Sequence, residues 1–382
     1  MSLRAVRTQE VQLCFNLCQV FRESYSMAQR KLLVIFLLAG ALDSGTLRSH
    51  AQAAPGPTLM DNTAQPNKSA SPEAIFAEAR RLSEQGKYQD AIAQLQELAA
   101  RNPQPAGLSH ELGTAYYRKG EYLKAAEYLK QALTQNPKDD EAVQLLGLSY
   151  YLAGRPSEAI PYLEKVQTWY PHANVDASYI LGICYIQSKN YPQARVAFAK
   201  MFDVGPDTAA SYLFTARMLF RQEFDPVAEE YAQKAIGLDP KLPLAHYLLG
   251  ELHLYKSRIP EAIADFHQEL AINPGYAAAY YGLADAYSRL QKYDEAERLL
   301  QRSIWLDATS TGPYILMGKV LEKKGETVLA VRALQRAVAM DPNNPITHHL
   351  LGQSYRDLGK TEDAERELKL GEQLQQKQDA SQ

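Results

Sequence analysis

The sequence predicts an all-α protein, an α-solenoid in which about nine helical hairpins follow one another along the chain. Three observations predict this fold class. Alanine recurs at steps of 34 residues, with one step of 35, and small residues and prolines recur in phase with it. Between these positions, apolar residues stand three or four apart, which is the spacing of one buried stripe on a helix. The composition, 46% hydrophobic and 22% charged, is that of a globular chain.

Residues 1–53 have the features of a leader. Two basic residues precede an apolar run at residues 32–42, and residues 51–53 read Ala-Gln-Ala; this is the order found in secretory signals. The run is shorter than the roughly 20 residues that span a bilayer. We therefore expect a secreted chain, periplasmic or envelope-associated, that starts at Met27 and has no membrane-spanning segment when mature. The alternative is a buried or interfacial segment.

Residues 54–71 contain mainly Pro, Ala, Asn and Ser without helical periodicity, which predicts a flexible linker. The solenoid is expected over residues 72–377, and residues 378–382 are expected to form a short tail.

Residues 106–137 show one hairpin clearly. Two helical segments are separated by a turn at Gly120, and Pro137 ends the second, because proline disfavours the helical conformation of the residue before it. Helices of about 13 residues are only marginally stable alone in water. Each hairpin is therefore expected to pack against its neighbours.

Two sets of small residues share the 34-residue period. The alanines are Ala91, Ala125, Ala159, Ala194, Ala228, Ala262, Ala296, Ala330 and Ala364. The small residues of the first helices are Ala79, Gly113, Gly147, Gly182, Ala216, Gly250, Ala284, Gly318 and Gly352. Because glycine inside a helix costs about 1 kcal/mol relative to alanine, these glycines indicate a close approach of two helices. We expect the alanine of the second helix to face the glycine.

These residues resemble the tetratricopeptide repeat, a 34-residue helix–turn–helix unit, over nine units. The tryptophan usual at the fourth position of that repeat is absent from every unit. The resemblance implies a right-handed solenoid without catalytic activity, whose first helices line a concave groove that binds protein or peptide.

No motif for catalysis is found: the sequence has no glycine-rich phosphate loop, nucleophile elbow or Cys-x-x-Cys pair. Cys184 and His253 fall at positions expected to be buried. His246 and His253 are seven residues apart without a third ligand, so neither a metal site nor a cofactor is expected. Outside residues 1–53, 35 Lys and Arg stand against 41 Asp and Glu, a net charge of −6, which argues against nucleic acid as the main partner. Trp169 and Trp305 are expected to cover the next hairpin.

The resemblance places candidate ligand-binding residues on the inward positions of the first helices. They are His110, Tyr117, Arg118, Tyr151, Tyr179, Ile183, Ile186, Arg217, Phe220, Arg221, Tyr247, Tyr255, Tyr281 and Arg289. Aromatic residues and arginine are the types that dominate binding energy at interfaces. The alternative is that these side chains pack, half buried, against adjacent first helices.

We therefore expect a non-enzymatic scaffold that binds extended peptide or protein segments in its groove and assists assembly of an envelope complex. The alternative is a structural component of a polysaccharide-export or outer-membrane machine that docks through its outer faces. The sequence assigns no oligomeric state and no individual partner.

Overall fold

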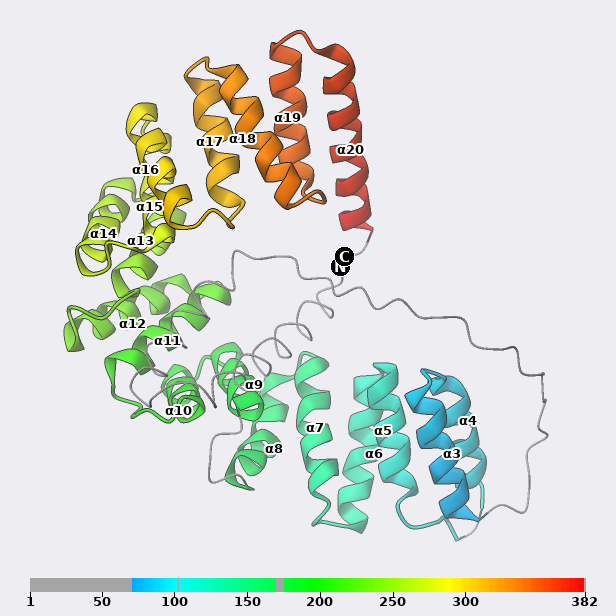
Figure 1. Ribbon diagram of the computed structural model, residues 1–382. Coiled ribbons are helices and arrows are strands. Elements are labelled where there is room, and N and C mark those ends of the chain that lie inside the picture. The colour runs from blue at the N-terminus through cyan, green and yellow to red at the C-terminus, as the bar shows by residue number, and fades with distance from the viewer. Residues whose placement is uncertain (1–70, 102, 170–174, 381–382) are drawn as a thin grey trace. The chain divides into compact units, whose positions relative to one another are not determined.

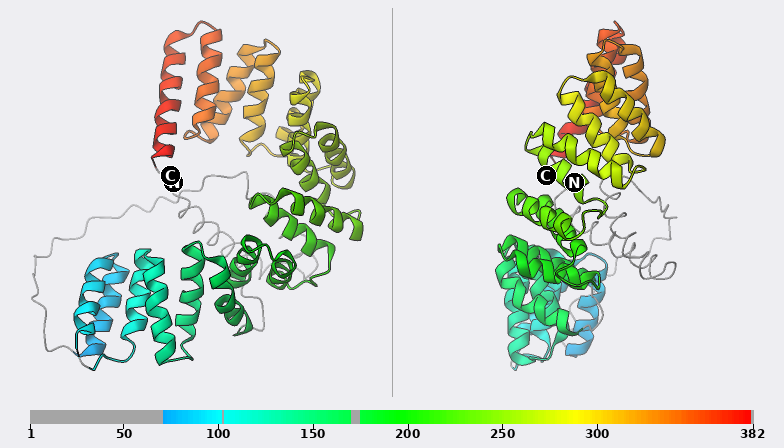
Figure 2. Two further views of the ribbon diagram at one scale, coloured as in Figure 1. Left: turned by 180° about the vertical axis from the view of Figure 1, so that it is seen from behind. Right: turned by 90° about the vertical axis from the view of Figure 1, so that its left-hand side faces the viewer.

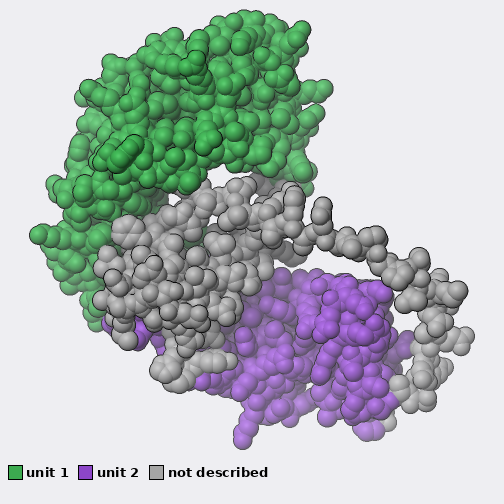
Figure 3. Space-filling model, viewed as in Figure 1, with its two compact units in different colours: residues 1–48, 207–382 green, residues 49–206 purple. Residues whose placement is uncertain are grey.

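The computed structural model describes residues 71–101, 103–169 and 175–380. These residues form the helices α3 to α20 and contain no strand, so the all-α prediction is confirmed. Chain contacts define two compact units, unit 2 with residues 49–206 and unit 1 with residues 1–48 and 207–382 (Figure 3). The predicted leader, the start at Met27 and nearly all of the linker lie outside the described residues.

Unit 2 contains four helical hairpins, which follow one another in chain order (Figure 1). Its helices are α3 (Pro72–Glu84), α4 (Tyr88–Ala99), α5 (Leu108–Lys119), α6 (Tyr122–Gln135), α7 (Asp140–Leu152), α8 (Pro156–Trp169), α9 (Val175–Gln187) and α10 (Tyr191–Met201). The odd-numbered helix of each hairpin is called its first helix and the even-numbered helix its second.

Unit 1 contains five more hairpins, and Figure 2 shows their order from two further sides. Its helices are α11 (Ala209–Arg221), α12 (Asp225–Leu238), α13 (Ala245–Tyr255), α14 (Ile259–Ile272), α15 (Ala277–Arg289), α16 (Tyr293–Leu306), α17 (Gly312–Lys323), α18 (Thr327–Met340), α19 (Pro345–Asp357) and α20 (Thr361–Asp379). The last helix continues two residues past the expected end at residue 377. Among the described residues, no helix is long and apolar enough to cross a bilayer.

Within each unit, the first helices contact the first helices of neighbouring hairpins, as α5 does with α7 and α13 with α15. The surface made by the exposed sides of these helices is called the first-helix face. The turn between the two helices of every hairpin contains one residue with positive φ, such as Gly120 at 86° and Gln291 at 61°. Glycine fills this position in five of the nine turns, since it adopts that conformation without steric cost.

The close approach of the two helices in a hairpin is confirmed, but its partner residue differs from our expectation. A Cβ built on Gly113 would lie 2.6 Å from Leu129 Cγ, and one on Gly250 would lie 2.6 Å from Phe266 Cε1. The glycine is therefore covered by a large residue four positions after the periodic alanine, not by the alanine itself. Side chains on a helix lean toward its N-terminus, so a residue one turn later covers this spot.

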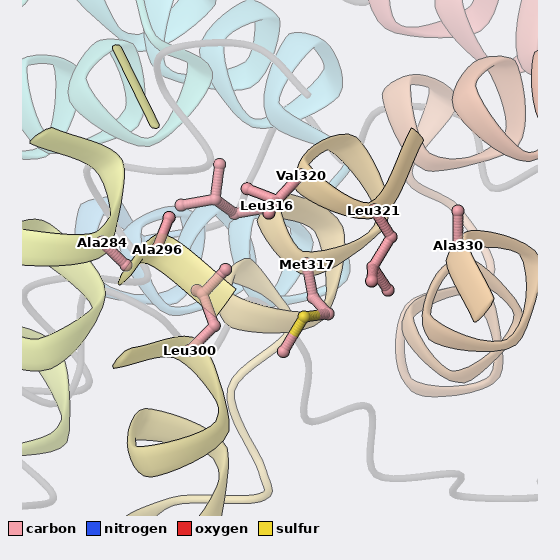
Figure 4. Close-up of a cluster of buried hydrophobic side chains, with 8 residues drawn as sticks. All are labelled: Ala284, Ala296, Leu300, Leu316, Met317, Val320, Leu321 and Ala330. Carbon is pink, nitrogen blue, oxygen red and sulfur yellow. The ribbon is translucent and has the colours of Figure 1, made fainter. Parts of the chain in front are cut away.

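The core runs through successive hairpins. Figure 4 shows one part of it, in which Leu300 of α16 packs with Leu316, Met317 and Val320 of α17. Because each hairpin supplies only part of such a cluster, no hairpin buries its apolar stripe alone.

Candidate binding surface

The fourteen candidate residues lie on first helices of both units, seven in each. In unit 2 they belong to α5, α7 and α9, and in unit 1 to α11, α13 and α15. The two groups therefore belong to different compact units.

In unit 2, two candidates are buried. Ile183 and Ile186 are 2% and 0% exposed, so their side chains belong to the packing of α9 and are not available to a ligand. His110 is also engaged: its Nδ1 lies 2.7 Å from Oδ2 of Asp139, the residue whose side chain caps α7. His110 therefore links α5 to the start of α7.

The aromatic candidates of unit 2 are half buried. Tyr117 packs edge-on against Tyr122, with ring centroids 5.9 Å apart, and burial raises the pKa of its phenol. Tyr179 packs against Phe198, and Tyr151 is half buried as well. Arg118 is exposed. These aromatic side chains thus match the half-buried alternative.

In unit 1, Phe220 of α11 and Tyr255 of α13 form an edge-to-face pair, with ring centroids 5.8 Å apart and ring planes at 73°. Tyr255 is 62% exposed, whereas Phe220 is half buried. Edge-to-face packing is a favourable aromatic geometry. The pair therefore presents an aromatic platform to solvent on the first-helix face.

A polar group joins the same two helices as this platform. Arg217 Nη1 of α11 lies 2.5 Å from Glu251 Oε2 of α13, and the Tyr247 hydroxyl donates to Glu251 Oε1 at 2.8 Å. Burial acts to lower the pKa of Arg217, but Glu251, together with Tyr247 and Tyr276, outweighs it and the pKa is raised. Tyr247 is buried at 8% exposure, and burial raises the pKa of its phenol well above its ordinary value. Tyr247 therefore supports the surface rather than forming it.

The remaining candidates lie on α11 and α15. Arg289 Nη1 donates to the carbonyl oxygen of Leu254 at 3.2 Å, and its Nη2 lies 2.8 Å from Asp285 Oδ2. It thereby joins α15 to the end of α13. Tyr281 is half buried beside the core, and Arg221 is exposed.

A polar network between hairpins was not foreseen from the sequence. Glu229 of α12 accepts hydrogen bonds from Lys256 at 2.8 Å and Arg258 at 2.6 Å. His253 is buried, as predicted, with Nε2 3.4 Å from Glu229 Oε1 and Nδ1 2.7 Å from Asp265 Oδ2. Burial acts to raise the pKa of Glu229, but these hydrogen bonds outweigh it and lower the pKa to about 2.

The sequence did hold a signal for this network. Glu229 occupies a register that is aliphatic in most second helices, and Lys256 follows 27 residues later. Glu297 and Lys324 repeat the same spacing and also pair, at 2.5 Å. A carboxylate in an apolar register, with a lysine at a fixed distance in the next hairpin, predicts such a pair.

The described residues offer little for catalysis or small-molecule binding. No group of three potential metal ligands occurs among them. Cys184 is buried, as predicted, and burial raises the pKa of its thiol to about 12, so it is not a nucleophile. A hollow of about 260 Å³ in unit 2 is smaller than typical ligand pockets. Its lining residues are Leu123, Ala126, Glu127, Lys130, Tyr150, Arg155 and Glu158.

Three family models described as tetratricopeptide repeat match the chain. One matches residues 76–140 and 110–174, the second residues 150–217 and 254–304, and the third residues 333–366. These matches cover hairpins of both units.

The chain is similar to parts of known proteins, one of which is named for this repeat. The tetratricopeptide repeat domain-containing protein PYG7, chloroplastic, of Arabidopsis thaliana is 27% identical over 26% of this chain and 35% of its own length. The DnaJ homolog subfamily C member 7 homolog of Dictyostelium discoideum is 25% identical over 35% of this chain and 28% of its own. The chain thus matches about a third of the length of these curated relatives. The structure of the APC/C hetero-tetramer Cut9-Hcn1 is 22% identical, with a TM-score of 0.42, over 74% of this chain and 56% of that one.

Proposed function

Because the chain belongs to the tetratricopeptide repeat family, whose members are generally non-catalytic scaffolds that bind peptides or proteins, we propose that it binds an extended peptide or protein segment on the first-helix face of unit 1. The platform of Phe220 and Tyr255 anchors that segment. The proposal is limited to this face because the candidates of unit 2 are mostly buried or half buried.

The exposure of Tyr255 carries this proposal. At its register, the other first helices hold mostly polar residues, among them Arg118, Gln187 and Lys323. The repeat therefore does not need an aromatic side chain there, yet Tyr255 stands 62% exposed against Phe220. Exposed aromatic residues of this kind supply most of the binding energy at many interfaces.

The platform also has a fixed base. The Arg217–Glu251 ion pair ties α11 to α13, and Arg289 ties α15 to the last turn of α13 through the Leu254 carbonyl. These contacts hold the three first helices in register. A surface that is ordered before binding loses less entropy when a ligand binds, which favours affinity.

The test uses the full chain with Phe220→Ala and Tyr255→Ala together, as bait for affinity purification with mass spectrometry. We expect the captured proteins to be lost while circular dichroism stays that of the wild type. Leu238→Ala, which removes an exposed apolar side chain from a second helix, is the matched control and should capture normally. Unchanged capture by the double variant would refute the platform.

A photo-crosslinking amino acid at position 255 identifies the bound segment directly. Crosslinks to an extended segment of one protein support the proposal. The same amino acid is also placed in turn at positions on second helices. Crosslinks that form only from those positions contradict the proposal and favour the alternative, docking through outer faces within a polysaccharide-export or outer-membrane machine.

The leader pattern of residues 27–53 supports a cellular setting for this activity. We propose that the chain is secreted, periplasmic or envelope-associated, and that it assists assembly of an envelope complex. Fractionation of cells, with sequencing of the N-terminus of the native product, tests this. A product that is cytoplasmic, or that retains residues before Met27, would contradict it.

A further inference from the structure

Four arginines lie on the exposed side of two consecutive second helices in unit 1. Arg298 and Arg302 are one turn apart on α16, and Arg332 and Arg336 occupy the same registers on α18. Like charges one turn apart destabilise a helix. The arginines are therefore a feature that folding alone does not favour. Together with Trp305 they are called the arginine face.

The repeat does not require these arginines. At the register of Arg298 and Arg332, the second helices α4 to α14 hold Ala93, Glu127, Pro161, Val196, Glu230 and Ala264. At the register of Arg302 and Arg336, they hold Glu97, Gln131, Lys165, Lys200, Lys234 and Gln268. Arginine at both registers occurs only in α16 and α18.

The protein neutralises little of the positive charge of this face. Within the described part of the chain, no carboxylate forms an ion pair with any of the four arginines. Asp294 and Glu297 of α16 pair with Lys324, whose Nζ lies 2.9 Å from Asp294 Oδ1 and 2.5 Å from Glu297 Oε2. Asp294 also interacts electrostatically with Arg298, which helps to lower the pKa of this carboxyl. An anionic partner therefore fits the face.

Apolar side chains stand exposed beside the arginines. The sequence predicts that Trp305 covers the next hairpin, but this is wrong, because its side chain is 72% exposed. The Arg302 guanidinium lies 4.3 Å from its ring and 6.0 Å from the ring of Tyr280. Val328 and Leu329, at the start of α18, are 55% and 43% exposed. Val328 precedes Arg332 by one helical turn and therefore shares its side of the helix.

We propose that the arginine face docks on the surface of an anionic lipid bilayer. The arginines pair with headgroup phosphates, and Trp305 enters the interface between headgroups and acyl chains. Tryptophan favours that interface, and exposed apolar residues beside clustered basic residues are typical of helices that lie on membranes. Nucleic acid or an acidic protein segment could satisfy the arginines, but a bilayer also accommodates Trp305 and Val328.

This docking is compatible with peptide binding. The arginine face belongs to the second helices α16 and α18, whereas the platform of Phe220 and Tyr255 belongs to the first helices α11 and α13. A docked chain thus keeps the platform available, and the two activities can be tested separately.

Flotation of the full chain with phosphatidylcholine vesicles, with and without phosphatidylglycerol, tests the proposal. We expect binding to the anionic vesicles only, weakening as salt is added. Each basic residue near an anionic surface contributes about fivefold to binding, so Arg302→Gln with Arg336→Gln should weaken it about 30-fold. Lys165→Gln with Lys234→Gln, at the same register of α8 and α12, makes the same charge change and should bind normally. Equal binding by both double variants would overturn the proposal.

A local readout separates this face from any contribution of the apolar run at residues 32–42. With Trp169→Phe, Trp305 is the remaining tryptophan, and its emission should shift to the blue on anionic vesicles alone. Arg302→Lys with Arg336→Lys keeps the charge and should retain binding. Unchanged Trp305 emission on vesicles overturns the proposal. So does an arginine variant that loses binding to RNA or polyglutamate but not to vesicles.

Discussion

Replacing Gly250 with alanine tests how the two helices of a hairpin pack. A Cβ at this position would lie 2.6 Å from Cε1 and 2.8 Å from Cδ1 of Phe266. The ring cannot move away easily, because a Cβ built on Gly282, in the next hairpin, would lie 2.6 Å from its Cζ. Phe266 is 0% exposed. It thus fills the space between two glycines.

The size of the effect follows from two opposing contributions. Alanine in place of glycine within a helix favours folding by about 1 kcal/mol. An extra methyl group in a well-packed core costs about 1–3 kcal/mol, and a ring held on both sides places this site toward the upper end of that range. We therefore expect Gly250→Ala to lower the free energy of unfolding by about 1–2 kcal/mol.

Gly237→Ala makes the same chemical change without the contact. Gly237 lies within α12, and a Cβ built on it has no atom within 4 Å. We expect this variant to be stabilised by up to about 1 kcal/mol. A repeat array need not unfold in one step, so hydrogen exchange of the amides in the affected hairpin measures the local free energy of opening better than a global melting temperature.

A second variant identifies the cause of the effect. Phe266→Leu, combined with Gly250→Ala, reproduces the pairing of Ala284 with Leu300, both of which are fully buried in the core of α15 and α16. The penalty for Gly250→Ala should be smaller in this background. If Gly250→Ala alone is as stable as the wild type, or if its penalty is the same with and without Phe266→Leu, the packing argument is refuted.

Three further outcomes follow from titratable groups that are buried or half buried. Glu269→Ala removes the carboxylate that accepts hydrogen bonds from the backbone N–H groups of Leu244 and Tyr247 at 2.9 and 3.3 Å, so the free energy of unfolding of the hairpin should fall by about 1–3 kcal/mol. Burial raises the pKa of Glu269, so the stability that this shift contributes should be greatest below the ordinary pKa of 4.5 and fall as pH rises through the raised pKa. Denaturation at several pH values will show this. The pKa of Glu229 is lowered to about 2, so its stabilisation should be present above pH 4.5 and be lost as pH falls toward 2, and Glu229→Gln should remove this acid sensitivity in hydrogen exchange. Cys184 should resist alkylation in the folded chain and react once the chain is unfolded, as peptide mass spectrometry will show.

The periodic part of the fold was predictable because each hairpin repeats the same residues. The 34-residue spacing indicated nine hairpins, and nine hairpins are found among the described residues. The contact partner of the glycines was not predicted correctly. Spacing shows which residues share a helix face, but the lean of side chains along the helix decides that Leu129, not Ala125, covers Gly113.

The candidate surface was less predictable than the fold. Register placed Ile183 on the same helix face as Tyr255 of a later hairpin, yet one is 2% exposed and the other 62%. The exposure of a side chain depends on how far neighbouring helices cover it. This coverage differs even between hairpins that share the periodic alanine and glycine. The resemblance to the tetratricopeptide repeat therefore predicts which helix face a side chain lies on, but not how much of it is exposed to solvent.

Departures from the repeat are the best guide to function in such a chain. Positions that hold a large apolar residue in nearly every hairpin are accounted for by packing, as those of Leu129 and Phe266 are. An exposed aromatic at 255, where most hairpins hold a polar residue, contributes little to the core and leaves apolar surface in water. Arginines one turn apart on α16 repel each other, and neither forms an ion pair with a carboxylate of the described residues. Folding does not favour the exposed aromatic residue or the paired arginines, so binding of a partner gives a physical reason for each. Both features lie in residues 207–382.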